Sequence, residues 1–181
     1  MKKNKLVFCI GISGSGKSFL RSQLEDKFGN KIKAICPDDL RKSVLGDINK
    51  QDENDKIFAI AANKTKESLK NNYITYFDAT GLNWSQNKKS IIDYTENLNI
   101  EVLILFFMDS EDLELCKERI FQDLLQGKDR SKVPENISDK QHEKFMICMK
   151  NALDDDNIPS NWSIILYNSN EFKFILNLLK G

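Results

Sequence analysis

The sequence predicts an α/β domain in which helices cover both faces of a five-stranded parallel sheet. Apolar segments of strand length alternate with segments of helical periodicity along the whole chain of 181 residues. Because parallel strands need crossover connections, this alternation indicates successive right-handed strand–helix–strand units. The length is that of one α/β domain, so we predict that residues 1–181 form a single domain.

Five apolar segments are predicted as strands: 5–10, 31–36, 73–78, 100–108 and 162–167. The fourth, IEVLILFFM, is the most apolar, which indicates a central or near-central strand. Helices are predicted between and after these strands, at 18–28, 39–45, 53–71, 83–98, 110–125, 138–153 and 171–180. Capping-box patterns predict where two of them begin, at Asn83 with Gln86 and at Ser138 with Gln141.

Composition excludes several classes of protein. Hydrophobic residues make up 40% of the chain and charged residues 30%, which is ordinary for a globular protein. No apolar run approaches the roughly 20 residues of a membrane span, and the chain starts almost directly with a strand, which leaves no room for a signal peptide. The four cysteines lie far apart without a C-x-x-C pair, which favours reduced thiols in a cytoplasmic protein. The net charge of zero argues against a long electrostatic contact with duplex nucleic acid.

Residues 11–18, GISGSGKS, match the phosphate-loop (Walker A) pattern G-x-x-x-x-G-K-[ST] between a predicted strand and a predicted helix. Glycines let backbone N–H groups approach phosphate oxygens, and the helix N-terminus adds partial positive charge. In such a loop Lys17 reaches the β- and γ-phosphates and Ser18 ligates Mg²⁺. The flanking strand and helix favour this interpretation over a glycine-rich turn that binds nothing. The sequence therefore predicts a three-layer P-loop NTPase fold that binds ATP and Mg²⁺ through Gly11, Ser13, Gly14, Ser15, Gly16, Lys17 and Ser18.

Ligands of open α/β sheets bind at the carboxyl ends of the strands, and polar residues follow the second predicted strand. The segment there reads Pro37-Asp38-Asp39-Leu40-Arg41. A carboxylate at this place could accept a hydroxyl proton, and an arginine three residues later lies about one helical turn away on the same side. That pairing suits phosphoryl transfer to an alcohol on an anionic molecule. Equally, Asp38 or Asp39 could be a helix N-cap and Arg41 a solvated surface residue.

Three further features are candidates for the same site. Asp78 follows the third predicted strand, the usual position of a carboxylate that organises magnesium, although a plain turn aspartate would look the same. Residues 127–134, GKDRSKVP, are cationic and bounded by glycine and proline. They predict a mobile lid, at about 126–137, that brings a guanidinium onto the transferring phosphoryl group, with a solvated basic loop as the alternative. Arg119, on the preceding predicted helix, could stack on the nucleotide base.

Together these segments resemble the kinase domain of polynucleotide 5′-hydroxyl kinases of the phage and bacterial RNA-repair type, over roughly residues 3–152. The motifs that carry the resemblance are GISGSGKS, ICPDDLR, DAT and RSKVP, in that order. The resemblance implies that Asp38 is the general base, that Arg41 binds the phosphate next to the acceptor hydroxyl, and that the lid arginine Arg130 contacts the transferred phosphate. It also implies substrate-binding positions at Asp78 and Thr80.

Pro37 departs from the polar or basic residue expected in that family just before the aspartates, which puts the approach of the acceptor in doubt. We predict an ATP-dependent kinase that transfers the γ-phosphoryl group to a hydroxyl, with the 5′-OH end of DNA or RNA as the expected acceptor. The alternatives are a kinase of a small molecule or modified nucleobase with the same layout, and a non-enzymatic ATP-binding sensor. The expected catalytic residues are Asp38, Lys17 and Arg130, the expected ATP contacts include Arg119 and Arg130, and the expected Mg²⁺ ligands are Ser18 and Asp78.

Overall fold

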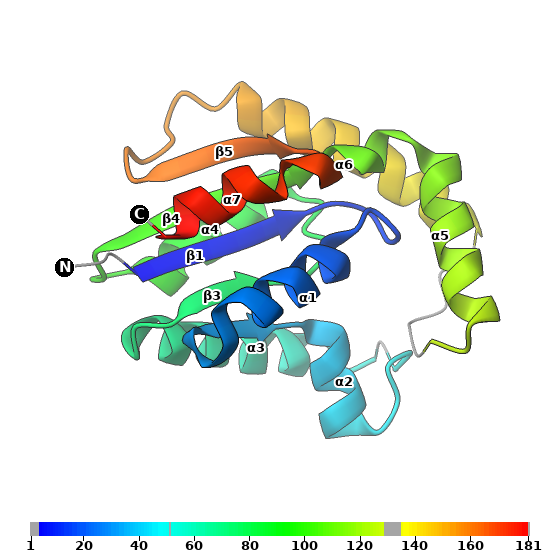
Figure 1. The fold of residues 1–181 in the computed structure, drawn as a ribbon, viewed down its shortest axis with the longest axis horizontal. Helices are drawn as coiled ribbons and strands as arrows, with labels where there is room; N and C mark the ends of the chain where they lie inside the picture. The colour runs from blue at the N-terminus through cyan, green and yellow to red at the C-terminus, as the bar shows by residue number, and fades with distance from the viewer. Residues whose placement is uncertain (1–3, 51, 129–134, 181) are drawn as a thin grey trace.

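The computed structural model describes residues 4–50, 52–128 and 135–180, and it has a three-layer α/β architecture around one parallel sheet (Figure 1). The strands lie in the order β2-β3-β1-β4-β5, and every neighbouring pair is parallel. Their bounds are β1 (Asn4–Ile10), β2 (Ile32–Ile35), β3 (Ile74–Phe77), β4 (Ile100–Phe107) and β5 (Trp162–Tyr167). The predicted fold is confirmed, including the near-central place of the most apolar strand.

Seven α-helices surround the sheet in the described part of the chain: α1 (Lys17–Phe28), α2 (Pro37–Leu45), α3 (Asn54–Lys70), α4 (Trp84–Thr95), α5 (Leu113–Leu125), α6 (Glu135–Leu153) and α7 (Phe172–Lys180). Side chains of α1 and α7 share one buried cluster with the sheet, and side chains of α3, α4 and α6 share the other. Figure 1 shows α2 and α5 beyond the carboxyl ends of the strands. None of the helices in the described ranges is long and apolar enough to cross a bilayer.

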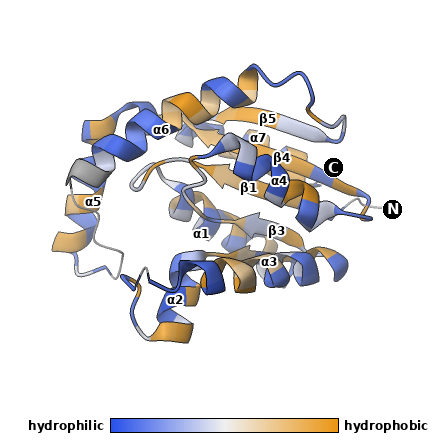
Figure 2. Cartoon of the chain, turned by 180° about the vertical axis from the view of Figure 1, so that it is seen from behind, coloured by the Kyte–Doolittle hydropathy of each residue, from blue (hydrophilic) through white to orange (hydrophobic). Residues whose placement is uncertain are grey.

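The central strand β1 sends alternate side chains into the two cores. Val7 and Cys9 pack toward α1 and α7, whereas Leu6, Phe8 and Ile10 pack toward α3, α4 and α6. A parallel strand buried on both faces reads as an uninterrupted apolar run, which is why the sequence predicts it well. Figure 2 shows the hydrophobic β1 and β4 at the centre and hydrophilic residues on the outer parts of the helices. The carboxyl end of β1 is thereby held rigidly where the phosphate loop begins.

Three helix starts differ from the prediction by two or three residues, and the other four by one. Helix α2 begins at Pro37, whose fixed φ suits the first turn, so Asp38 and Asp39 lie inside that turn and neither is the N-cap. Helix α5 begins at Leu113, after a short 3₁₀ segment (Met108–Glu111), and its N-cap Asp112 accepts a hydrogen bond from the Leu115 N–H at 2.9 Å.

Helix α6 begins at Glu135, so the capping box predicted at Ser138 is wrong: Ser138 is a buried residue within the helix. Asn83 is the N-cap of α4, as predicted, because its Oδ1 accepts a hydrogen bond from the Gln86 N–H at 3.1 Å. The four cysteines are all free.

Candidate active site

The phosphate loop connects β1 to α1 and depends on two glycines in left-handed conformations. Gly14 has φ of +84° and Gly16 has φ of +95°, a region that residues with a side chain rarely adopt. A Cβ atom on Gly14 would lie 2.4 Å from the carbonyl oxygen of Cys116, so the loop passes directly against the backbone of α5. The loop also joins the neighbouring strand end, because the Gly11 N–H donates to Thr80 O at 3.1 Å.

Three side chains from distant segments hold the loop in place. The Ile12 N–H donates to Ser110 Oγ at 3.1 Å, and the Ser13 N–H donates to Gln141 Oε1 at 3.2 Å. The Tyr76 hydroxyl donates to the carbonyl oxygen of Lys17 at 2.8 Å. Sequence reasoning missed all three roles, because no local pattern marks a contact that depends on how the strands and helices pack.

The side chain of Lys17 is buried in the loop that it serves. Its ammonium group donates to the carbonyl oxygens of Gly11 at 2.9 Å and Ile12 at 2.7 Å, and lies 3.4 Å from Ser15 Oγ. Burial lowers the pKa of Lys17, and the carboxylate of Asp78 opposes that shift. Because the Lys17 ammonium group is buried beyond the carboxyl end of β1, little water screens its charge, and it can interact strongly with a phosphate.

Ser18 and Asp78 form the second polar pair of the site. Ser18 Oγ donates to Asp78 Oδ2 at 3.2 Å, and the backbone N–H of Asp78 donates to Ile35 O at 2.9 Å. The strand order β2-β3-β1 explains this proximity, because β3 ends beside the phosphate loop. Asp78 is buried, and burial raises the pKa of its carboxyl group although Lys17 and Arg21 act in the opposite direction.

The Ser18–Asp78 pair fits a magnesium ion of the kind that kinases use. Magnesium takes oxygen ligands and is commonly held by one or two protein oxygens together with substrate phosphates and water. A hydroxyl and a carboxylate 3.2 Å apart beside a phosphate loop supply such a donor set. Within the described ranges no group of three or more histidine, cysteine or acidic side chains could form an all-protein cage.

Asp38 and Arg41 meet in the first turns of α2, as the spacing predicts. Arg41 donates from Nη1 to Asp38 Oδ1, and from Nε and Nη2 to Asn54 Oδ1 at 3.0 and 2.7 Å. The Arg41 side chain is 6% exposed and that of Asp38 is 43% exposed, so the arginine is fixed in the protein while the carboxylate faces outward. The alternative in which Arg41 is a solvated surface residue is therefore excluded. Sequence reasoning missed Asn54, which comes from α3.

Asp39 points away from this pair. Its Oδ2 accepts a hydrogen bond from Arg21 Nη1 at 2.6 Å, and Arg21 also pairs with Glu25 at 3.2 Å on α1. The two neighbouring aspartates thus have different partners, and Asp39 joins α2 to the outer face of α1.

Of the remaining predicted site residues, Arg119 lies against the phosphate loop. Its Nη1 donates to Gly14 O at 3.3 Å and to Asp109 Oδ2 at 2.7 Å. Thr80 lies at the loop through its carbonyl oxygen. The central part of the predicted lid, with Arg130, lies outside the described residues; α5 ends before it and α6 begins after it.

Comparison with known proteins agrees with this architecture. A family model described as an AAA domain matches residues 6–146. No curated protein sequence matches the chain.

Among solved structures, a chain of the Pnkp1/Rnl/Hen1 RNA repair complex is 20% identical with a TM-score of 0.69, over 83% of this chain and 47% of that one. A crystal structure from Chloroflexus aurantiacus is 11% identical with a TM-score of 0.67, over 99% and 98% of the two chains. Deoxyadenosine kinase from M. mycoides with bound dATP is 17% identical with a TM-score of 0.54, over 98% and 100%. The chain thus spans about half the length of the RNA repair protein and nearly all of the other two, and it shares with them a P-loop kinase fold.

Proposed function

The chain belongs to the AAA domain family, and on that premise we propose that it is an ATP-dependent kinase whose acceptor is the 5′-hydroxyl end of a DNA or RNA strand. The observation that carries the proposal is the Asp38–Arg41 pair, a carboxylate and an anion-binding group side by side after β2, at the same edge of the sheet as the phosphate loop. The family and the fold support a phosphotransferase. The specific acceptor rests on this pair and on the resemblance of the motifs to polynucleotide kinases.

Asp38 is the proposed base. Its exposed carboxylate takes the proton of the acceptor hydroxyl while the acceptor oxygen bonds to the γ-phosphorus of ATP. The bond from that phosphorus to the β–γ bridging oxygen breaks in the same transfer, and ADP leaves. Arg41 holds Asp38 in place through Nη1, so the carboxylate does not rotate away from the acceptor.

Arg41 is also the proposed binding group for the phosphate on the 3′ side of the terminal nucleoside. A guanidinium carries five N–H donors, and three of them are used by Asp38 and Asn54. The other two can bind phosphate oxygens in the fork geometry that arginine offers. The hydrogen bonds to Asn54 on α3 keep the Arg41 guanidinium in one orientation, which favours an acceptor whose phosphate has a fixed position.

On the ATP side, Lys17 and the loop N–H groups are the proposed phosphate ligands, with Arg119 against the loop and Arg130 as the proposed lid arginine. Ser18 and Asp78 would hold Mg²⁺, which when bound neutralises charge on the triphosphate oxygens. Because Lys17 is buried, little water screens its charge, so it can act strongly on the transferring group.

A comparison of three acceptors tests this proposal: a nucleoside, the nucleoside 3′-monophosphate, and an oligonucleotide with a 5′-hydroxyl. We expect kcat/KM to be low for the nucleoside and high for the other two, because only these carry the phosphate that Arg41 binds. Arg41→Ala should raise KM for the oligonucleotide and remove the preference for acceptors that carry this phosphate, with the KM for ATP little changed. Arg41→Lys, which keeps the charge without the fork, should recover part of the loss.

Two outcomes would point elsewhere. Equal use of the three acceptors by the wild type would remove the strand-end proposal in favour of a kinase of a small molecule or modified nucleobase. Slow ATP hydrolysis that no acceptor stimulates would favour a nucleotide-binding sensor. Thermal melting of each variant serves as the control for folding, since Arg41 is buried and joins α2 to α3.

A further inference from the structure

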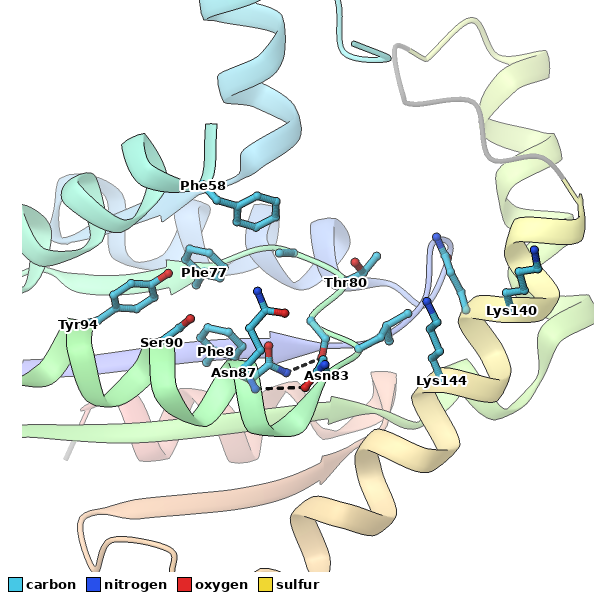
Figure 3. Close-up of a pocket in the computed structure, with 15 residues that line it drawn as sticks. Phe8, Phe58, Phe77, Thr80, Asn83, Asn87, Ser90, Tyr94, Lys140 and Lys144 are labelled. Atoms are coloured by element: carbon cyan, nitrogen blue, oxygen red, sulfur yellow. Dashed lines mark hydrogen bonds between the residues drawn. The ribbon is translucent and has the colours of Figure 1, made fainter. Parts of the chain in front are cut away.

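A cavity of about 770 Å³ opens beside the phosphate loop, on the face of the sheet that α3, α4 and α6 cover (Figure 3). Its lining includes Thr80 and Gln141, which are the two residues that bind the loop at Gly11 and Ser13. Asp78, proposed above as a magnesium ligand, is two residues before Thr80 in the chain. The cavity therefore begins beside the phosphate loop and extends along the face of the sheet toward Tyr94.

Aromatic rings form the inner walls. Phe8 and Phe77 stack with centroids 5.0 Å apart and an interplanar angle of 5°, and the ring of Tyr94 lies 5.8 Å from that of Phe77. Phe58, on α3, is 43% exposed although it lines the same space. An exposed phenylalanine beside buried aromatic rings offers a flat apolar face to a planar ligand.

Polar groups line the α4 side. The buried side chain of Asn87 donates from Nδ2 to Gly81 O at 2.5 Å, which fixes the orientation of its amide. Gln86 and Ser90 line the cavity from the same helix. Amides and a hydroxyl beside aromatic rings are groups that can bind a planar ring with hydrogen-bonding atoms on its edge.

Two lysines line the other end of the cavity. Figure 3 shows Lys140 and Lys144 on α6, at the opposite end of the cavity from Tyr94. Neither ammonium group forms an ion pair with a residue in the described ranges. Positive charge at one end and aromatic surface at the other match a ligand that joins a planar ring to an anionic group.

We propose that this cavity binds the nucleobase of the terminal nucleotide of the acceptor, with Lys140 and Lys144 near phosphates of the strand beyond the one that Arg41 binds. The inference rests on the proposed function and names the part of the acceptor that the cavity recognises. The volume lies within the ordinary range of ligand cavities, on the order of 300–1,000 Å³. Stacking tolerates every base because each has a π-face, so the cavity selects for the presence of a base more than for its identity.

The first test compares two oligonucleotides with a 5′-hydroxyl, one intact and one whose terminal nucleotide lacks its base. The wild type should use the intact acceptor with a kcat/KM about tenfold higher or more, as expected for loss of one stacked base. Phe58→Ala should reduce this preference by raising KM for the intact acceptor alone, and Ser90→Phe, which fills the cavity, should do the same. Phe174→Ala is the matched control, because Phe174 is 51% exposed on α7 and lies across the sheet from the cavity.

Equal use of the two oligonucleotides by the wild type would overturn the inference. So would a rise in the KM for ATP in Phe58→Ala and Ser90→Phe with the acceptor KM unchanged, because the cavity would then bind the donor.

A second measurement is independent of turnover. Saturation-transfer NMR should detect binding of a nucleoside 3′-monophosphate to the wild type and to Phe174→Ala, and weaker binding to Phe58→Ala and Ser90→Phe. If no strand end is phosphorylated but this binding pattern is found, the proposed function fails and the cavity assignment stands. If strand ends are phosphorylated but the four proteins bind the nucleotide equally, the cavity assignment fails and the proposed function stands.

Discussion

Ser18 at the start of α1 donates a hydrogen bond to Asp78 at the end of β3, at 3.2 Å, although 60 positions separate them in the chain. The pair exists because β1 and β3 are neighbours and parallel, so the segments that follow them leave the sheet at the same edge. Asp38 follows β2, the next strand along. The proposed magnesium ligands, the phosphate loop and the proposed base are thus brought together by strand order alone.

Lys17→Met should lower turnover by a factor of about 100 or more, because it removes the cation that faces the phosphates while keeping most of the side-chain volume. The melting temperature should change by only a few degrees, since methionine can occupy the buried path of the lysine stem. Steady-state kinetics with ATP, together with thermal melting, measure the two effects. A folded Lys17→Met protein with wild-type turnover would contradict the assignment of the nucleotide site.

The two neighbouring aspartates should behave differently. Asp38→Asn removes the proposed base and should lower kcat by about 100-fold while the KM for ATP stays within a few-fold. Asp39→Asn should leave kcat nearly unchanged and cost at most about 1 kcal/mol of stability, because its pair with Arg21 is half-exposed. If Asp39→Asn proved the more damaging change in kcat, the assignment of the base to Asp38 would be wrong.

Gly14→Ala should disrupt the loop for a steric reason. The new Cβ would lie 2.4 Å from Cys116 O, so the loop or α5 has to move, and φ of +84° disfavours a side chain in any case. Gly46→Ala is the matched control, because Gly46 also has a positive φ, of +73°, but no atom lies within 4 Å of its Cβ position. Equilibrium binding of ATP should be much weaker in Gly14→Ala and unchanged in Gly46→Ala. Equal binding by the two variants would show that the contact with α5 does not shape the loop.

Asp155 gives the fold a pH-dependent contribution. Its carboxylate accepts hydrogen bonds from Lys88 at 2.7 and 2.9 Å and from Trp84 Nε1 at 2.8 Å, and these lower its pKa to about 2. Because the folded-state pKa lies below the ordinary value of 3.8, the ionised group stabilises the fold above that pH. This stabilisation is lost as the pH falls through the lowered pKa.

Asp155→Asn should therefore melt at a lower temperature than the wild type at neutral pH, and the difference should shrink as the pH falls from 3.8 toward about 2. Asp93→Asn, which removes an exposed pair with Lys66, should leave the melting temperature nearly unchanged at every pH. A difference for Asp155→Asn that stays constant down to the lowest pH would contradict a stabilisation that depends on ionisation of this carboxylate.

The parts of the fold that the sequence predicts are those with local signals. Buried parallel strands are continuous apolar runs, the phosphate loop has a fixed spacing, and Asp38 and Arg41 lie one helical turn apart. The capping box at Ser138 failed because the same residue types also occur inside a helix, where Ser138 is buried by tertiary packing. The local sequence pattern does not distinguish a helix cap from a position inside a helix.

The contacts that the sequence does not predict join elements far apart in the chain. Asn54 orients Arg41 from another helix, and Gln141, assigned by its spacing to a helix cap, accepts a hydrogen bond from the phosphate loop. The aromatic cavity is a further example, because Phe58 and Tyr94 each look like ordinary residues of an amphipathic helix. Which helices lie side by side decides these contacts.

The most direct test of the central claim is transfer of label from γ-labelled ATP to matched oligonucleotides that differ only at the 5′ end. The account predicts that an oligonucleotide with a 5′-hydroxyl is labelled and stimulates ATP consumption, that the same oligonucleotide with a 5′-phosphate is not labelled, and that Asp38→Asn labels neither. Absence of label on the 5′-hydroxyl oligonucleotide in DNA and RNA form, with an active nucleotide site shown by ATP binding, would contradict it.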